Sequence, residues 1–207
     1  MTRLNEVDVV RAGRRIAERV GARTLTMRML AAELNVSTMA AYRHVVSKTD
    51  LLFLIADDIL SGVVIPPPEA GEWDVRLAIL ESSAFAEVSR VPDLWDLLPP
   101  GRTIPSEVRL ERAVSDILIS AGFEPASASW AQEAIFGYVF GQIRLRMRVI
   151  SNQGEASHTE LQAHFAYGLR IMLTGLKVER EAETSRPIGR GSLSATAVTR
   201  PPDRSDR

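Results

Sequence analysis

The stretch that decides the fold, TMRMLAAELNVSTMAAYRHVVSKTDLL, runs from Thr26 to Leu52. Its first part carries apolar residues at the i, i+3, i+4 and i+7 positions of one helical face, namely Met27, Leu30, Ala31 and Leu34. The hydroxyl of Thr26 can accept a hydrogen bond from a free backbone N–H and so cap this helix. This spacing predicts a short helix over residues 26–34.

A tight turn follows at Asn35, Val36 and Ser37. Asparagine tolerates the left-handed backbone that a tight turn requires, and serine can cap the helix that comes next. A second helix is predicted over residues 38–45, with the small residues Ala40 and Ala41 on it. Two short helices joined by a tight turn are the layout of a helix-turn-helix DNA reader, whose second helix enters the major groove.

The motif continues in a fixed order with Tyr42, His44, Val45, Ser47, Lys48, Leu51 and Leu52. In these residues the chain resembles the N-terminal domain of the TetR family of transcriptional regulators. The Tyr-x-His-Val variant is similar to the tetracycline-repressor branch of that family. The resemblance covers roughly residues 8–60, and the segment FAYGLRIMLTGL at 165–176 is similar to the closing helix of the same branch. It implies a DNA-binding head and a body that senses a small molecule. Because a single short recognition helix cannot supply enough discrimination between DNA sequences, we also expect a symmetric homodimer with two heads.

Charge is segregated along the chain, although the whole chain carries a net charge of only −1. Residues 1–48 contain nine Lys and Arg against four acids, whereas residues 49–183 contain eleven against twenty. A basic segment on an acidic body is typical of a phosphate-binding module joined to a module that does not bind nucleic acid. For Arg11, Arg14, Arg15 and Arg19 individually, the solvated face of the first helix remains an equal alternative.

The apolar pattern predicts an all-α fold, because no alternating strand pattern of useful length is present. Helices are predicted over residues 5–20, 26–34, 38–45, 47–62, 73–89, 92–98, 105–121, 126–150 and 155–178. We predict a helix-turn-helix domain over 1–48 and a ligand-binding and dimerisation domain over 49–183, with a helix over 49–64 connecting them. The run Pro66-Pro67-Pro68 should form an extended linker. Residues 184–207, rich in Ser, Thr, Pro, Gly and Arg, should be a disordered tail.

Composition argues against several other classes of protein. The chain has no cysteine, and it has no long apolar run that would span a membrane or serve as a signal peptide, so we expect a cytoplasmic protein without a membrane partner. No nucleophile elbow, metal box or phosphate loop is present, so neither an enzyme nor a cofactor is expected. His158 and His164 are six residues apart, which is not the i, i+4 spacing of helical metal ligands, so no metal site is expected.

Two groups of DNA contacts are predicted on the head. Hydroxyl groups and cations near helix starts should contact phosphates, and these are Thr26, Arg28, Tyr42 and Lys48. Residues of the second helix and the turn before it should lie at or near the bases, and these are Ser37, Thr38, Met39, Arg43 and His44. Two alternatives stay open: Tyr42 as a core aromatic residue, and His44 as a cap for the end of its helix.

The resemblance implies that the body holds a small molecule. Candidate lining residues on the central helices are Trp73, Leu77, Trp95, Arg102, Trp130, Glu133, Phe136 and Phe140, with Leu80, Phe85, Leu98 and Leu110 as further apolar candidates. For each of them the alternative is ordinary core packing. Arg102 and Glu133 are the polar candidates, because a buried charge needs a partner or a ligand.

Two apolar stripes are predicted to form the dimer surface. The last helix carries Leu161, Phe165, Gly168, Leu169, Met172, Leu173 and Leu176, and the preceding helix carries Ile135, Val139, Ile143, Met147 and Ile150. The alternative is that both stripes pack on the core of their own domain.

The function predicted from these features is that of a ligand-responsive repressor. It would bind a palindromic double-stranded DNA operator as a homodimer and be released by a small hydrophobic or aromatic molecule, such as a drug or an antibiotic. The alternative is a DNA-binding regulator, either a repressor or an activator, that is constitutive or controlled by a partner and has no small-molecule ligand. A cavity with a few convergent polar groups would favour the first, and a filled core the second.

Overall fold

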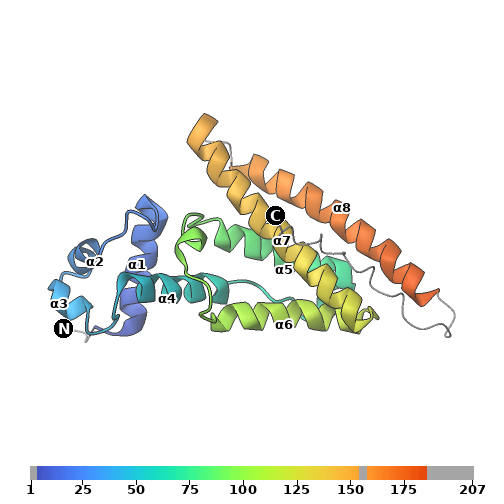
Figure 1. Cartoon of the computed structure of the whole chain (residues 1–207), viewed down its shortest axis with the longest axis horizontal. Coiled ribbons are helices and arrows are strands. Elements are labelled where there is room, and N and C mark those ends of the chain that lie inside the picture. Colours follow the sequence, from blue (N-terminus) through green and yellow to red (C-terminus); the bar gives the residue numbers. More distant parts are fainter. Residues whose placement is uncertain (1–3, 154–157, 186–207) are drawn as a thin grey trace, which may run out of the picture.

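The computed structural model describes residues 4–153 and 158–185, and this part of the chain contains eight α-helices and no strand (Figure 1). The predicted all-α fold is therefore confirmed. Three short helices form the head: α1 (Glu6–Val20), α2 (Met27–Glu33) and α3 (Thr38–Ala41). Five further helices follow: the first connects the head to a larger body, and the other four form that body.

Side-chain caps set where the head helices begin. The carboxamide of Asn5 accepts a hydrogen bond from the Asp8 N–H at 2.8 Å, which forms a capping box at the start of α1. Thr26 caps α2 through the Met29 N–H at 3.2 Å, and Ser37 caps α3 through the Ala40 N–H at 3.2 Å. Both caps are those that the motif predicts.

The turn between α2 and α3 also has the predicted backbone, because Asn35 adopts a φ of 53°. The predicted length of the second helix, however, is wrong, since α3 ends at Ala41 rather than at residue 45. The Arg43 N–H donates to the Ala40 carbonyl, and the His44 N–H donates to the Ala41 carbonyl. This three-residue spacing closes a tight turn instead of continuing an α-helix.

Helix α4 (Lys48–Ser61) connects the head to the body, and it packs against α1, α5 and α6. Ser47 caps it through the Asp50 N–H at 3.0 Å. The helices α1 and α4 approach closely at Gly13, where a Cβ atom would lie 3.0 Å from Ile55 Cδ1. Helix α4 thus packs against both the head and the body.

The body consists of α5 (Trp73–Val88), α6 (Pro105–Ser120), α7 (Pro125–Gln153) and α8 (His158–Thr184). Two short 3₁₀ turns, η1 (Pro68–Ala70) and η2 (Trp95–Leu97), lie in the connections. The predicted helix over 92–98 is therefore wrong except for the η2 turn. In Figure 1 the long helices α7 and α8 run side by side along one side of the body.

Helix α8 continues six residues beyond its predicted end, to Thr184. Contacts with the start of α5 and α7 hold this last part: Arg180 lies over the Trp73 ring at 5.7 Å, and Glu183 accepts a hydrogen bond from Ser127. Of the predicted tail, residues 186–207 lie outside the described residues, as do residues 155–157 of the predicted last helix.

The stripes predicted for dimerisation pack within the chain's own core instead. On α8, Phe165, Leu169 and Leu173 are buried, and the Phe165 ring stacks on Phe85 at 4.1 Å. On α7, the side chains of Ile135, Val139 and Ile143 are buried as well, whereas those of Met147 and Ile150 lie outside the described side chains. The buried residues of these stripes are therefore not available as a dimer surface. None of the helices within the described residues is long and apolar enough to cross a membrane.

Candidate functional site

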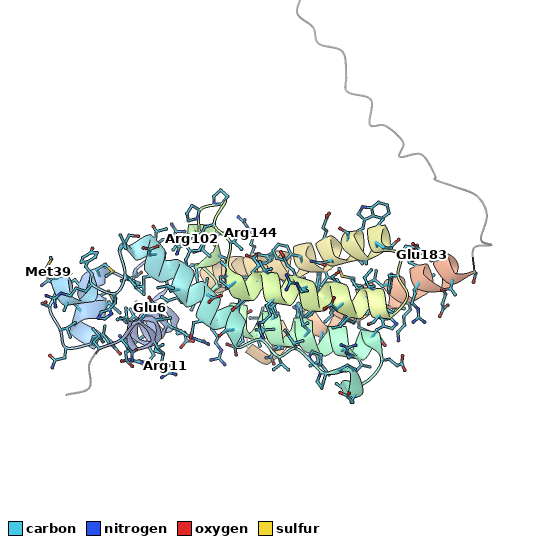
Figure 2. The ribbon with its side chains drawn as sticks, turned by 90° about the horizontal axis from the view of Figure 1, so that it is seen from below. Glu6, Arg11, Met39, Arg102, Arg144 and Glu183 are labelled. Carbon is cyan, nitrogen blue, oxygen red and sulfur yellow. The ribbon has the colours of Figure 1, made fainter. Side chains whose placement is uncertain are left out.

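The predicted DNA contacts lie in the head, on or close in sequence to α2 and α3, with Lys48 at the start of α4. The side chains of Thr26, Arg28, Ser37, Thr38, Met39, Tyr42 and Arg43 are exposed, and His44 and Lys48 are half-buried. Met39 is the most prominent, with 73% of its surface exposed, and Figure 2 places it at the tip of the head, at the opposite end of the molecule from Glu183. The geometry therefore brings all nine residues to the same end of the molecule.

Two arginines of this surface are available to bind phosphate. Within residues 4–153 and 158–185, the side chains of Arg28 and Arg43 form no ion pair or hydrogen bond. By contrast, Arg15 and Arg19 on α1 both contact Glu33, at 3.5 and 3.3 Å. Arg28 on α2 and Arg43 just after α3 therefore each carry a charge that no carboxylate of the described residues neutralises.

Tyr42 and Lys48, two of the predicted phosphate contacts, differ in how their side chains are held. Tyr42 ends α3 and keeps 44% of its surface exposed, which argues against the alternative of a core aromatic residue. The Lys48 Nζ donates a hydrogen bond to the Arg23 carbonyl at 2.8 Å, so its charge is fixed at the start of α4. A cation held at a helix start can set the position of a DNA backbone without reading its sequence.

The head is joined to the body by a half-buried cluster of charges around Arg14. Its guanidinium group contacts Glu18 at 3.0 Å, Asp58 of α4 at 2.9 Å and Glu87 of α5 at 2.9 Å. Burial by itself lowers the pKa of Arg14, but the hydrogen bonds to these carboxylates outweigh it and leave the pKa raised. Arg14 is therefore a structural cation between three helices rather than part of a solvated face.

A second connection runs through Asp93, in the loop after α5. Its carboxylate accepts hydrogen bonds from the backbone N–H groups of Ala22 at 3.0 Å and Arg23 at 2.9 Å, just after the end of α1. Gly21 adopts a φ of 83° there, and a Cβ atom would lie 3.1 Å from the Asp93 carboxylate. A loop of the body thus holds the backbone of the head directly.

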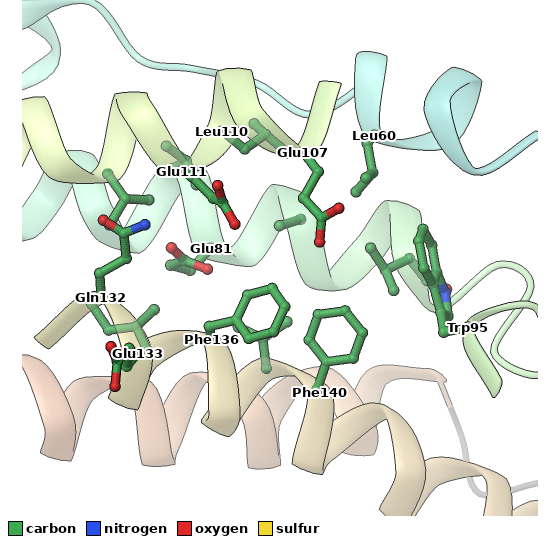
Figure 3. Close-up of a pocket in the computed structure, with 16 residues that line it drawn as sticks. Leu60, Glu81, Trp95, Glu107, Leu110, Glu111, Gln132, Glu133, Phe136 and Phe140 are labelled. Atoms are coloured by element: carbon green, nitrogen blue, oxygen red, sulfur yellow. The ribbon is translucent and has the colours of Figure 1, made fainter. Parts of the chain in front are cut away.

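The body contains a cleft of about 200 Å³ between α5, α6 and α7 (Figure 3). Its walls are mainly apolar, and they include Leu60 at the end of α4 and Trp95 of η2. The Trp95 indole N–H donates to the Val88 carbonyl at 3.1 Å, which fixes the orientation of the ring. Phe140 packs edge to face against Trp95, with ring centroids 6.2 Å apart. The concave, mostly apolar walls are those of a small-molecule site, while the volume is below the roughly 300 to 1,000 Å³ of sites for drug-sized ligands.

Four of the eight predicted ligand contacts line this cleft: Trp95, Glu133, Phe136 and Phe140. Leu80 and Leu110, predicted as further apolar candidates, line it as well. Phe136 and Phe140 pack together at 4.4 Å between ring centroids and form one wall. The structure therefore brings together residues from α5, α6, α7 and η2.

The other four predicted contacts lie elsewhere. Trp73, the first residue of α5, packs edge to face on Phe123, and Leu77 is fully buried in the core. Arg102 pairs with Asp50 of α4 and lies over the Phe53 ring at 4.4 Å, so it already has partners. Trp130 points away from the core, with 69% of its surface exposed.

Three carboxylic acids of the cleft, Glu81, Glu107 and Glu111, are absent from the sequence prediction. Figure 3 shows their carboxyl groups directed into the space beside Phe136 and Phe140. Glu81 is 5% exposed, and burial raises its pKa to about 7. Burial, and then the charge of Glu111, raises the pKa of Glu107. The sequence could have identified Glu81 as a candidate, because it lies between Leu77 and Phe85 on the apolar face of α5.

Within residues 4–153 and 158–185, no group of three or more His, Asp or Glu side chains is arranged to hold a metal ion. His164 is exposed on α8, and the side chain of His158 lies outside the described side chains.

Comparisons with known proteins agree with the helix-turn-helix geometry. Residues 9–55 match the family described as bacterial regulatory proteins of the tetR family. An HTH-type transcriptional regulator of Saccharopolyspora erythraea is 31% identical, with 84% of each chain covered. The class G tetracycline repressor protein of Vibrio anguillarum is 29% identical, with 69% of each chain covered. Among solved structures, a TetR variant of Acinetobacter baumannii AYE in complex with minocycline has a TM-score of 0.72 at 25% identity, covering 86% of this chain and 99% of its own.

A helical body joined to a helix-turn-helix head of this geometry defines a DNA-binding transcriptional regulator. The chain belongs to the TetR family of transcriptional regulators.

Proposed function

We propose that this regulator is a repressor that binds a palindromic operator as a homodimer and leaves it when a small hydrophobic or aromatic molecule binds in the cleft. One observation carries the proposal: the walls of the cleft include parts of the elements that hold the head. Leu60 is on α4, whose other end carries Lys48, and Trp95 lies two residues after Asp93.

Two routes can transmit ligand binding to the head. A ligand that displaces Leu60 moves the end of α4, and α4 packs on α1. A ligand that displaces Trp95 moves the loop whose Asp93 holds the Ala22 and Arg23 N–H groups. Either shift would favour a state in which the two recognition helices of a dimer no longer match half-sites one turn of DNA apart. A coupling of about 1 to 3 kcal/mol between the sites is typical and suffices for release.

The similarity to a tetracycline-repressor structure supports the class of ligand. That protein is in complex with minocycline, and the cleft described above has walls of Trp95, Phe136 and Phe140. Flat aromatic ligands suit such walls, because rings pack favourably against aromatic side chains.

The homodimer is proposed to form through the outer faces of α7 and α8. On α8 these faces expose Tyr167, Ile171 and Val178, and on α7 they expose Trp130 and Leu145. Three glycines, Gly137, Gly141 and Gly175, have open space beside them, which allows a second copy to approach closely. Large exposed apolar side chains next to small residues are typical of helix packing surfaces.

Replacing Ile171 with glutamate should therefore disrupt the dimer. A symmetric interface contains the substitution twice, so two charges would have to be buried, and the dissociation constant should rise at least about 100-fold. Analytical ultracentrifugation over a range of concentrations measures this directly. The matched control is Ile119→Glu, because Ile119 is similarly exposed but lies on α6. Equal effects of the two substitutions would argue against the outer face of α8.

Replacing Arg28 with alanine should weaken binding to all DNA sequences alike. Its guanidinium group is exposed and unpaired within the described residues, so its proposed role is to contact phosphate. Two copies act in a dimer, and the slope of log affinity against log salt concentration should fall by about two. Arg112→Ala, an exposed arginine of α6, serves as the control. An unchanged salt slope would remove Arg28 from the phosphate contacts.

The proposed function is tested by measuring binding of the purified protein to labelled DNA from upstream of its own gene. The measurement is made at two salt concentrations, with and without a panel of aromatic drugs. Salt-dependent binding that one compound abolishes is the expected result. Specific DNA binding that no compound changes would instead favour a regulator without a small-molecule ligand.

A further inference from the structure

The cleft of the body contains an acid in a position where acids are rarely found. Glu81 is 5% exposed, lies on the apolar face of α5, and directs its carboxyl group into the cleft (Figure 3). Within the described residues it forms no hydrogen bond or ion pair. A buried carboxylate without a partner is strongly unfavourable, so its presence calls for a partner that the chain itself does not supply.

The other groups around the cleft do not supply such a partner either. The polar side chains that line it are Glu107 and Glu111 from α6, and Gln132 and Glu133 from α7. None of its lining residues is a lysine, an arginine or a histidine. The remaining walls are aliphatic or aromatic, with Trp95, Phe136 and Phe140 on one side. The cleft thus combines several acids with aromatic faces and lacks a positive charge.

We propose that the cleft selects a cationic aromatic or lipophilic molecule, with Glu81 as the counter-charge at its buried end and the aromatic side chains as its walls. This inference rests on the proposed function, because it names the class of ligand for the same cleft. A positive charge is attracted both by a carboxylate at close range and by the faces of aromatic rings. An anionic ligand would face four glutamates, and a neutral one would leave Glu81 without a partner.

The direct test uses three probes of the same fused tricyclic shape that differ in charge. These are the permanently cationic 10-methylacridinium, neutral 9-methylanthracene and anionic anthracene-9-carboxylate. Their binding to the full-length protein is measured at pH 8 by probe fluorescence. The cation should bind at least about tenfold more tightly than the neutral probe, and the anion more weakly than either.

The same measurement on Glu81→Gln separates charge from shape. The substitution keeps the size of the side chain but removes its charge, so the affinity for the cation should fall about tenfold while that for the neutral probe stays the same. Thermal unfolding of the variant shows that it is folded. Glu179→Gln, at an exposed position of α8, is the control and should change neither affinity.

Several outcomes would overturn the inference. Equal binding of cation and neutral probe, or an equal loss of both in Glu81→Gln, would show that the charge of Glu81 does not select the ligand, while the cleft would remain a ligand site. Absence of binding by all three probes would overturn it as well. Conversely, tight binding of the cation without release of operator DNA would support the charge preference and contradict the release mechanism of the proposed function.

Discussion

Replacing Arg14 with methionine is expected to lower the free energy of unfolding by about 2 to 3 kcal/mol. Methionine can fill much of the space of the arginine stem, so the main effect is electrostatic. Asp58 and Glu87 would lose the cation that each contacts at 2.9 Å, at the junction of α1, α4 and α5. Glu87 would keep Arg90, at 3.1 Å, whereas Asp58 would keep no cation within the described residues. The value lies below the roughly 3 to 5 kcal/mol of fully buried ion pairs, because Arg14 is only half-buried and Asp58 keeps a third of its side chain exposed.

Urea denaturation at a fixed protein concentration measures this loss of stability. Arg15→Met is a matched control, because Arg15 is the next residue on α1, has 57% of its side chain exposed and contacts only Glu33, at 3.5 Å. Exposed pairs of this kind contribute about 0 to 1 kcal/mol. A second variant, Arg14→Met with Glu87→Gln, should recover part of the lost stability. Equal destabilisation by Arg14→Met and Arg15→Met would contradict the buried role of Arg14.

The cluster around Arg14 also bears on regulation. The head is attached to the body through charged and polar contacts, namely the Arg14 cluster and the Asp93 carboxylate with the backbone after α1, in addition to the apolar packing of α4. Polar contacts of this kind have directional geometry and are lost over small displacements. They are therefore suited to distinguish between two orientations of the head.

The helix-turn-helix could be predicted from the sequence because its signals are local. Thr26, Ser37 and Ser47 cap the helices that follow them, and Asn35 adopts the left-handed backbone of the turn. The end of α3 could not be predicted, since no glycine or proline marks it. Arg14 and Arg15 show another limit, because they are neighbours on one helix. Only the packing of α4 and α5 against α1 makes Arg14 half-buried and paired on several sides while Arg15 stays exposed.

The cleft was predicted only in part, because aromatic character does not show which way a side chain points. Trp95 and Trp130 are the same residue type, yet one lines the cleft and the other is exposed. Glu81 did carry a signal, since it interrupts the apolar face formed by Leu77, Leu80, Ala84 and Phe85. An acid at a core position of an amphipathic helix is therefore as good an indicator of a binding site as an aromatic cluster.

The second large effect is expected from Glu81→Gln, which should stabilise the ligand-free protein at pH 8 and leave it nearly unchanged at pH 5. The folded protein holds the Glu81 proton up to a pKa of about 7, whereas the unfolded chain releases it near the ordinary value of 4.5. Between these values the folded state binds more protons, so the free energy of unfolding falls as the pH rises. The loss is on the order of 3 kcal/mol and is complete above pH 7.

Chemical denaturation of both proteins at pH 5, 6, 7 and 8 gives the difference in stability at each pH, in which contributions from other groups largely cancel. Glu107, Glu111 and Glu133 also line the cleft, and Glu107, whose pKa is raised too, should add a slope of the same sign in both proteins. Glu179→Gln should show no pH-dependent difference from the unaltered protein. If Glu81→Gln were instead less stable at pH 8, the Glu81 carboxylate would have to be stabilised within the chain. The cleft would then hold no uncompensated charge for a cation to neutralise.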